Sequence, residues 1–401
     1  MQILVINSGS SSIKYHIYEM EHTKLIFSGK VERIGEPDSY SVYRTHTRGD
    51  NIEEHKEKTS IVNHDAGLKL IFYLLGSNAA MSSIQAIGHR VVHGGEYFQL
   101  ATIINQDVID KIYEMTSLAP LHNAANLAGI EKTFQLYPQL PQIAVFDTAF
   151  FRTLPAHAYR YALPDNLYYD HQVRRYGFHG TSHQNVARQA ADYLQQPLET
   201  LRLITLHLGN GASVAAIRNG NCIDTSMGMT PLEGLIMGTR CGDLDPAVHF
   251  YLNQELGMNL DEIESMLNYD SGMKGLCGVS DMREVHRLIE KGDSRASLAI
   301  DMYCYKICKY IGAYYTALGG IDALVFTAGI GENDPVIRQI ICQQLSVLGI
   351  AINPTLNQTA TNPPFDICKE NTMVKVLVVE TKEELEIARQ TVSTINREKV
   401  S

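Results

Sequence analysis

The sequence predicts an α/β protein built from two related domains. Two segments, Ile3–Glu19 and Arg202–Asp224, share one order of features: an apolar run, a short polar turn that contains glycine, and a second, alternating run. We interpret them as two copies of a βββ unit, one opening each half of the chain, and Asn219-Gly220 predicts a type I′ hairpin turn in the second copy. Short apolar runs and amphipathic helical segments then alternate, which is the pattern of α/β proteins. The 401 residues exceed the roughly 150 of a typical single domain.

The other strands and helices are predicted from apolar spacing. Buried strands are expected at Ser83–Val92, Gln142–Phe146, Ala323–Thr327 and Val374–Val379, of which the last three are continuous apolar runs. Helical spacing is found at Asn123–Leu136, Ser182–Leu194, Ser294–Leu318, Asp334–Gly349 and Glu383–Asn396. Residues 36–60 are polar and irregular, and they predict a surface hairpin or loop.

Capping boxes are predicted at the start of two of these helices. Thr181 with Gln184, and Thr381 with Glu384, have the spacing at which a hydroxyl side chain and a side chain three residues later bond reciprocally to the backbone. The domain boundary is placed from the repeat, between Asp147 and Arg202.

Composition and charge exclude some classes of function. The formal net charge is −10, which argues against a nucleic-acid-binding protein, because such proteins carry a basic surface. It does not argue against an anionic small molecule, since a cleft can be basic inside an acidic protein. The seven cysteines all follow residue 221, which disfavours a secreted disulfide framework. We find no signal peptide and no apolar run of ~20 residues, so a cytoplasmic protein without a membrane partner is expected.

Three glycine-containing turns have the composition of phosphate-binding loops. They are Asn7–Lys14, His207–Gly211 and Ala328–Asn333. Small residues let backbone N–H groups approach an anion closely, and a lysine adds charge. The third turn precedes a helix, whose N-terminus favours anions, but it lacks the third glycine of a dinucleotide-binding fingerprint. The same sequences are compatible with hairpin and β–α turns that bind no ligand. The presence of two related turns, one in each half of the chain, favours a nucleotide-binding site instead.

Several charged residues stand beside glycines or at strand ends. Arg90, His179, Arg240 and Arg283 are such basic groups, and Asp147 follows a predicted buried strand. A carboxylate at the C-terminal end of a strand is well placed for function in an α/β sheet. Zinc is disfavoured, because the histidines lack a matching cluster of acids or cysteines.

Taken together, these segments resemble the acetate and propionate kinase family, within the actin-like ATPase superfamily. The matching stretches are NSGSSSIK, GHRVVHGGE, PLHNAAN, VFDTAF, RRYGFHGTSH, HLGNGASV, DTSMGMTPLEGLIMGTRCGD, SDMR, TAGIGEN and ETKEEL, and they cover nearly the whole chain in order. The resemblance implies two duplicated actin-like (ribonuclease H-like) βββαβαβα domains around an interdomain nucleotide cleft. Residues 1–148 with 383–401 would form the N-terminal domain, and residues 149–382 the C-terminal one.

The resemblance also implies the chemistry and the roles of single residues. It implies reversible phosphoryl transfer from ATP to acetate, with acetyl phosphate and ADP as products, by a homodimer that uses Mg²⁺, for which Mn²⁺ is expected to substitute. The catalytic residues would be Asp147, His179 and Arg240, and the metal site would include Asn7 and Glu383. Nucleotide binding would fall to Lys14, His207, Leu208, Gly209, Asn210, Gly211, Asp281, Met282, Arg283, Gly329, Ile330, Gly331, Glu332 and Asn333. Arg90 would bind the substrate carboxylate, and Val92, Leu121, Phe178 and Pro231 would surround the acyl tail.

Physical chemistry qualifies two of these implied roles. Asp147 is the family's catalytic acid, but the attacking carboxyl group has a pKa of ~4 and is already deprotonated at neutral pH. We therefore predict that Asp147 orients Mg²⁺, a water or an arginine. Val92 stands where propionate-preferring members of the family tend to carry alanine. Because valine leaves less room for the acyl tail, we predict that acetate is preferred over propionate as the substrate.

Alternative functions and one further residue remain open at this point. The alternatives are a propionate or butyrate kinase and, from another class, an actin-like ATPase without an acyl acceptor. The adjacent Arg240 also makes Cys241 a candidate reactive thiol, since a neighbouring cation lowers a thiol pKa.

Overall fold

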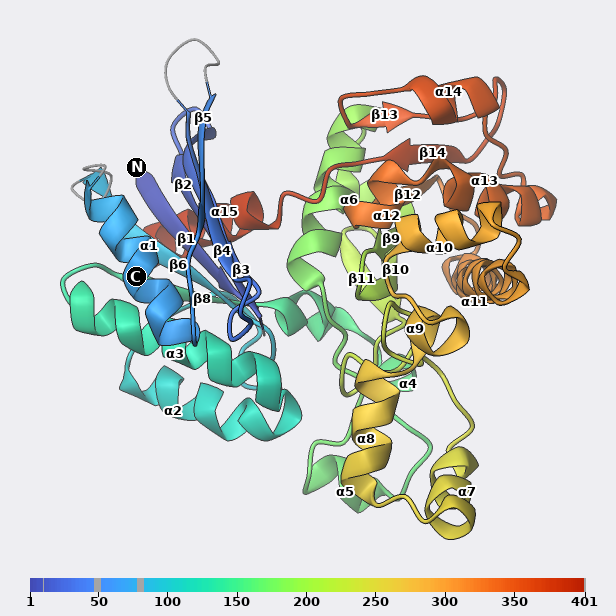
Figure 1. Ribbon diagram of the computed structural model, residues 1–401. Coiled ribbons are helices and arrows are strands. Elements are labelled where there is room, and N and C mark those ends of the chain that lie inside the picture. Colours follow the sequence, from blue (N-terminus) through green and yellow to red (C-terminus); the bar gives the residue numbers. More distant parts are fainter. Residues whose placement is uncertain (10, 47–51, 78–82, 400–401) are drawn as a thin grey trace. The chain divides into compact units, whose positions relative to one another are not determined.

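The computed structural model describes residues 1–9, 11–46, 52–77 and 83–399. The chain divides into two compact units (Figure 1). Unit 1 comprises Met1–Phe150 and Lys382–Ser401, and unit 2 comprises Phe151–Thr381. The chain therefore leaves unit 1 once and returns to it through its last helix.

The sheet of unit 1 has the strand order β5-β4-β3-β2-β1-β6-β8-β7. Its strands are β1 (Gln2–Ser8), β2 (Ser12–Glu19), β3 (Lys24–Glu32), β4 (Tyr40–His46), β5 (Ile52–Lys58), β6 (Ala86–Val91), β7 (Thr102–Ile103) and β8 (Gln142–Phe146). Strands β1, β6 and β8 are parallel neighbours, while β1 to β5 pair antiparallel in succession. The polar region at 36–60 is thus a hairpin, as predicted, and its two strands extend the sheet; residues 47–51 lie outside the described residues.

Helices cover both faces of this sheet. They are α1 (His64–Ser77), α2 (Gln106–Glu114), α3 (Pro120–Leu136) and α15 (Glu383–Glu398). Alternate residues of β1 serve the two sides: Leu4 and Ile6 belong to the core with α1, whereas Ile3 and Val5 pack in the core with α15. The period of two along a strand explains this division.

The sheet of unit 2 has the order β11-β10-β9-β12-β14-β13. Its strands are β9 (Arg202–Leu208), β10 (Ala212–Arg218), β11 (Asn221–Thr225), β12 (Ala323–Thr327), β13 (Phe365–Asp366) and β14 (Lys375–Val378). Three antiparallel strands followed by two parallel neighbours repeat the arrangement β3-β2-β1-β6-β8 of unit 1. The predicted duplication is therefore present. Asn219 and Gly220 both have positive φ (54° and 78°), as the predicted type I′ turn requires.

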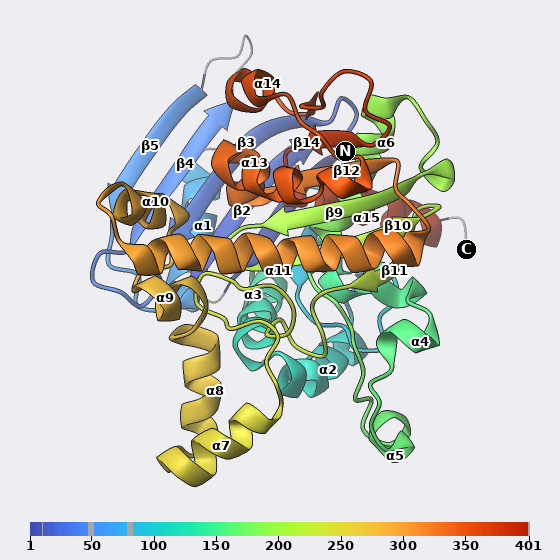
Figure 2. The same cartoon turned by 90° about the vertical axis from the view of Figure 1, so that its right-hand side faces the viewer.

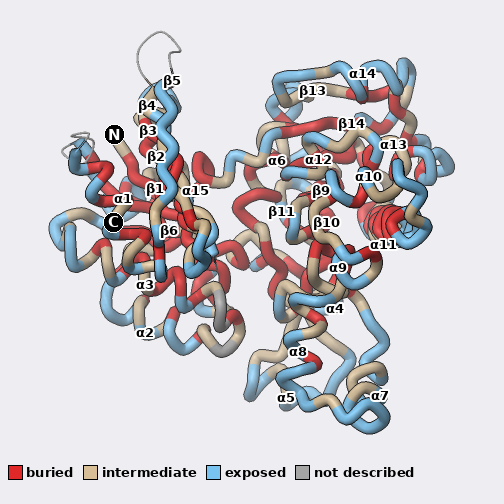
Figure 3. The backbone as a smooth tube through the Cα atoms, in the orientation of Figure 1, coloured by how far each residue is buried: buried red, intermediate tan, exposed pale blue. Residues whose placement is uncertain are grey.

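The helices of unit 2 lie between and around these strands. They are α4 (Ala156–Tyr159), α5 (Asp165–Tyr169), α6 (Gly180–Leu194), α7 (Ala247–Leu256), α8 (Leu260–Tyr269), α9 (Gly272–Cys277), α10 (Met282–Glu290), α11 (Ser294–Leu318), α12 (Ala328–Asn333), α13 (Pro335–Gln344) and α14 (Pro354–Thr359). The long helix α11 packs against β10 and α13 (Figure 2). Figure 3 shows the edge strand β5 exposed, whereas the central strands β1, β6 and β8 of unit 1 and β9, β10 and β12 of unit 2 are largely buried. Helix α7 has no buried residue.

Some predicted helix ends are wrong. Helix α6 begins at Gly180 after His179, whose φ of 60° lies in the left-handed region, so Thr181 is inside the helix and no capping box forms. Helix α15 follows Lys382, with a φ of 43° and no side-chain cap, because the Thr381 hydroxyl bonds to Glu332 instead. Asp334 does cap α13, as predicted, but α13 ends at Gln344.

Candidate active site

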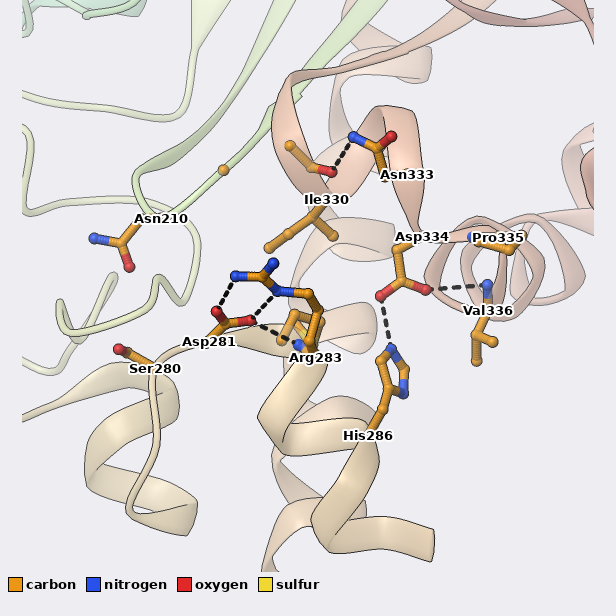
Figure 4. Close-up of a pocket in the computed structure, with 13 residues that line it drawn as sticks. Asn210, Ser280, Asp281, Arg283, His286, Ile330, Asn333, Asp334, Pro335 and Val336 are labelled. Atoms are coloured by element: carbon orange, nitrogen blue, oxygen red, sulfur yellow. Dashed lines mark hydrogen bonds and ion pairs between the residues drawn. The ribbon is translucent and has the colours of Figure 1, made fainter. Parts of the chain in front are cut away.

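A cavity of about 800 Å³ lies in unit 2 (Figure 4). This volume is within the range of roughly 300–1,000 Å³ that small-molecule sites occupy. Eight of the residues predicted to bind nucleotide line it: Gly209, Asn210, Asp281, Met282, Arg283, Gly329, Ile330 and Asn333. Five residues that the sequence did not single out as ligand contacts join them: Ser280, His286, Asp334, Pro335 and Val336. Turns that are far apart in the sequence therefore form one site.

Three parts of unit 2 line this cavity: the β9–β10 turn, the start of α10, and α12 with the start of α13. The turn between β9 and β10 is closed by a hydrogen bond from Gly209 N to Gly211 O (3.0 Å). Helix α10 is capped by Asp281, which accepts from the Arg283 backbone (2.9 Å) and also binds its guanidinium (3.0 and 2.5 Å). Since this ion pair lies at the surface, it contributes little to stability, and its value is to fix the start of α10.

His286 and Asp334 join two walls of the cavity. His286 Nε2 lies 2.6 Å from Asp334 Oδ2, while Asp334 Oδ1 accepts from the backbone N–H groups of Val336 and Ile337 (Figure 4). One carboxylate thus holds α10 to the start of α13. The Asp334-Pro335 signal marked the helix start in the sequence, but only the fold brings His286 to it.

Six residues predicted to bind nucleotide do not line the cavity: Lys14, which belongs to unit 1, and His207, Leu208, Gly211, Gly331 and Glu332. Leu208 is fully buried in the core. Gly331 is buried against the backbone of Phe326, from which a Cβ at this position would lie 3.4 Å away, an ordinary contact. The carboxylate of Glu332 bonds to Thr381 (2.7 Å). His207 and Gly211 belong to a second group of residues beside the cavity.

This second group centres on Gly211. A Cβ built at Gly211 would lie 3.4 Å from His179 Nε2 and 3.6 Å from Arg240 Nη1. The imidazole and the guanidinium therefore flank the same small space at the β9–β10 turn. Arg240 donates to the Pro231 carbonyl (3.2 Å), and among the described residues it forms no ion pair. Burial lowers the pKa of its guanidinium, so an anion beside it would relieve an electrostatic cost.

Neighbouring side chains fix the orientation of His179. Its Nδ1 lies 2.9 Å from Ser213 Oγ, and its ring stacks on His207 with centroids 4.1 Å apart. His183 contacts the same Ser213 hydroxyl (2.8 Å) from inside the core, where burial and, secondarily, the nearby His207 hold its pKa well below the usual value. The sequence assigned no role to His183 or Ser213.

Unit 1 carries a separate group of residues, at the ends of its parallel strands. Arg90 on β6 is largely buried (16% exposed) and donates from Nε and Nη2 to Asp147 Oδ2 (3.0 and 2.6 Å). Its Nη1 donates to Asn7 Oδ1 (3.2 Å), and Asn7 Nδ2 donates in turn to Glu384 Oε1 (3.1 Å). Of the three partners predicted for Asp147, the structure thus shows the arginine.

Both attraction and repulsion act among the charges of this group. Burial by itself would lower the pKa of the Arg90 guanidinium, but the charges of Asp147 and Glu383 outweigh it and raise the pKa. Burial is also the main reason that the pKa of Glu383 is raised, and Glu384 and Asp147 add to this. Burial by itself would raise the pKa of Glu384, but it is lowered overall by His16 and Lys14 together with hydrogen bonds from the backbone and Asn7.

The amide oxygen of Asn7 and the carboxylate oxygens of Glu383 and Glu384 are of the kind that Mg²⁺ prefers as ligands. The described residues contain no cluster of three or more His, Cys, Asp or Glu side chains able to hold a metal. Mg²⁺ does not need one, since it is commonly bound by one or two carboxylates together with substrate phosphates and water. A cation would also offset the burial, and the smaller repulsion from Glu384 and Asp147, that raise the Glu383 pKa. Glu384, which the sequence had given only a helix-capping role, is the carboxylate that contacts Asn7, and Lys14 Nζ lies 3.9 Å from it.

The residues predicted to surround an acyl tail are divided between the units. Val92 and Leu121 belong to unit 1, and Phe178 and Pro231 belong to unit 2. Val92 and Phe178 are buried, Pro231 is partly buried, and the side chain of Leu121 lies outside the described part of the chain. Cys241 does not fit a reactive thiol: burial raises its pKa to about 11, and the adjacent guanidinium does not lower it.

Comparison with known proteins identifies the family. The sequence model of the acetokinase family matches residues 2–389. The chain belongs to the acetokinase family. Relatives named acetate kinase include those of Syntrophobacter fumaroxidans, 48% identical over 99% of this chain and 98% of the relative, and of Helicobacter acinonychis, 49% identical over 98% of each. Among solved structures, Porphyromonas gingivalis acetate kinase is 42% identical with a TM-score of 0.89 and covers 98% of this chain and 99% of its own.

A propionate kinase is equally similar in fold. The enzyme from Francisella tularensis has a TM-score of 0.92 at 41% identity, over 98% of this chain and 99% of its own. The family and the fold class predicted from the sequence are confirmed by these comparisons. Within the described residues, no helix is long and apolar enough to cross a membrane.

Gly211→Ala tests the space between His179 and Arg240. The added methyl group would make ordinary contacts of 3.4 and 3.6 Å with them, so we expect little change in Tm. Because it occupies the space that an anion would fill, we expect kcat/KM for ATP to fall by about tenfold or more. Kinetics and thermal unfolding of the purified variant measure both. A fall in Tm that matched the loss of activity would contradict this interpretation.

Proposed function

We propose that this chain transfers the γ-phosphoryl group of ATP to a carboxylate oxygen of acetate, reversibly and in line, giving acetyl phosphate and ADP. The observation that carries the proposal is Arg240, a partly buried guanidinium that has no ion-pair partner among the described residues and lies beside His179 at the β9–β10 turn. Phosphoryl transfer needs cationic groups around the three equatorial oxygens of the transferring group. Arg240 and His179 can supply two such contacts.

The acetate carboxylate, which accepts the phosphoryl group, needs to be oriented and does not need to be deprotonated. A carboxylate is already ionised at neutral pH, so its oxygen can attack phosphorus directly while the bond to the β–γ bridging oxygen breaks and ADP leaves with that electron pair. Arg90 uses three of its five N–H groups on Asp147 and Asn7. The other two can bind the acetate carboxylate, and Asp147 then acts as a positioning residue.

Asn7, Glu383 and Glu384 are the residues that we expect to hold Mg²⁺. Mg²⁺ held there would neutralise negative charge that develops on the phosphates during transfer. Lys14, exposed near the start of β2, would supply a positive charge to a phosphate oxygen. The apolar lining residues of the cavity, Met282, Ile330 and Val336, suit the base of the nucleotide.

We also propose that the protein is a homodimer. Leu298, Met302 and Tyr305 are exposed at helical spacing on α11, and Phe250, Tyr251 and Leu256 are exposed on α7. Exposed apolar residues gathered in this way mark interaction surfaces. Sedimentation equilibrium should report twice the chain mass, and a monomer at micromolar concentration would contradict the proposal.

A hydroxamate assay tests acceptor and size preference together. Acyl phosphate trapped by hydroxylamine gives a coloured product, so colour should depend on added acetate, with propionate and butyrate weaker. Val92→Ala should raise kcat/KM for propionate relative to acetate by about five- to tenfold, because one methylene is worth only ~1–3 kcal/mol. ATP hydrolysis without hydroxamate would instead favour an ATPase that has no acyl acceptor, and a wild-type preference for propionate would overturn the size argument.

A further inference from the structure

One carboxylate in unit 2 gathers several hydrogen bonds without facing the cavity. Glu332 Oε1 accepts from the backbone N–H of Ala328 (2.9 Å), from the backbone N–H of Thr381 (3.0 Å) and from Thr381 Oγ1 (2.7 Å). Thr381 Oγ1 also accepts from Ala328 N (3.0 Å) and lies 3.0 Å from Thr327 Oγ1. These contacts join the start of α12 to the segment that follows β14.

The backbone at this junction is unusual on both sides. Ala328 has a φ of 65° and Lys382 a φ of 43°, in the left-handed region that non-glycine residues rarely adopt. Such conformations persist where the surrounding contacts over-determine them. The contacts of Glu332 with Ala328 and Thr381 supply such a constraint.

The same segment is also held by α6, the helix that follows His179. Asn185 Nδ2 donates to the Thr381 carbonyl (2.8 Å), and Gln189 Nε2 donates to the Glu380 carbonyl (3.0 Å). Thr381 is therefore tied to the helix behind His179 and to the short helix α12. The nucleotide loop, as we name residues Gly329–Asn333 of α12, contributes Gly329, Ile330 and Asn333 to the cavity lining. Thr381 is also the last residue of unit 2, and α15 with Glu383 and Glu384 begins two residues later.

We infer that Glu332 and Thr381 are positioning residues that couple occupancy of the nucleotide loop to the first turn of α15. This inference rests on the proposed function, since it takes the cavity to bind a nucleotide. Thr381 links the Gly329–Asn333 loop, the α6 helix and the carboxylates of α15 through direct bonds and two residues of chain. A nucleotide that orders the loop would thereby order the first turn of α15.

Hydrogen–deuterium exchange with ADP, without added metal, tests this coupling. In the wild type, ADP should slow exchange both at Gly329–Asn333 and in the first turn of α15. Thr381→Val keeps the side-chain shape but removes the hydroxyl, and it should retain protection of the loop while losing that of α15. Its kcat should fall by about tenfold, as expected for losing hydrogen bonds to a charged acceptor. Thr381→Ser should restore both, and Glu332→Gln should show a weaker form of the same loss.

Thr153→Val is the matched control, because it also removes one threonine hydrogen bond within unit 2 (to Cys222 O, 2.8 Å). It should behave as the wild type in exchange and in kcat. If α15 kept its ADP protection in both Thr381→Val and Glu332→Gln, the inference would be overturned while the nucleotide site stood. Absence of loop protection in the wild type would overturn the nucleotide site and the coupling with it.

Discussion

The ion pair between Arg90 and Asp147 sets the geometry of the unit 1 residues on which the proposed chemistry depends. Asn7, Arg90 and Asp147 come from β1, β6 and the end of β8, three adjacent parallel strands. Since parallel strands end at the same edge of a sheet, short side chains from each meet there without a long loop. A buried charge requires a partner. Asp147 and Asn7, at the ends of neighbouring strands, supply it and fix the orientation of the Arg90 guanidinium.

Unit 2 uses the same edge of a related sheet for a different task. The turn after β9 carries Gly209 and Asn210, and the short helix α12 directly after β12 carries Gly329 and Asn333. Strands β9 and β12 are parallel neighbours. The same arrangement of strands thus carries the Arg90 guanidinium with its carboxylates in unit 1, and the cavity beside Gly209 and Gly329 in unit 2. Residues at the strand ends, not the strand order, make the difference.

The sequence predicted the strand and helix order well because apolar periodicity and glycine turns are local signals. It gave the metal role to Glu383 and only a capping role to Glu384, because the sequence does not show which carboxylate of the first turn of α15 contacts Asn7. It placed Thr381 in a capping box, since the letters cannot show that Glu332, 49 positions earlier, competes for its hydroxyl. It likewise made Cys241 a candidate reactive thiol because Arg240 is adjacent, but burial raises the pKa of this thiol and the guanidinium does not lower it.

The most direct test of the central claim is the behaviour of Asp147→Asn. If Asp147 acts by orienting Arg90, the variant should raise KM for acetate by roughly 10- to 100-fold, the effect of weakening a hydrogen bond to a charged group, while the pH profile of kcat between pH 6 and 9 keeps its wild-type shape. An unchanged KM for acetate, with kcat collapsed and its pH dependence altered, would contradict the account and identify Asp147 as the group that moves a proton.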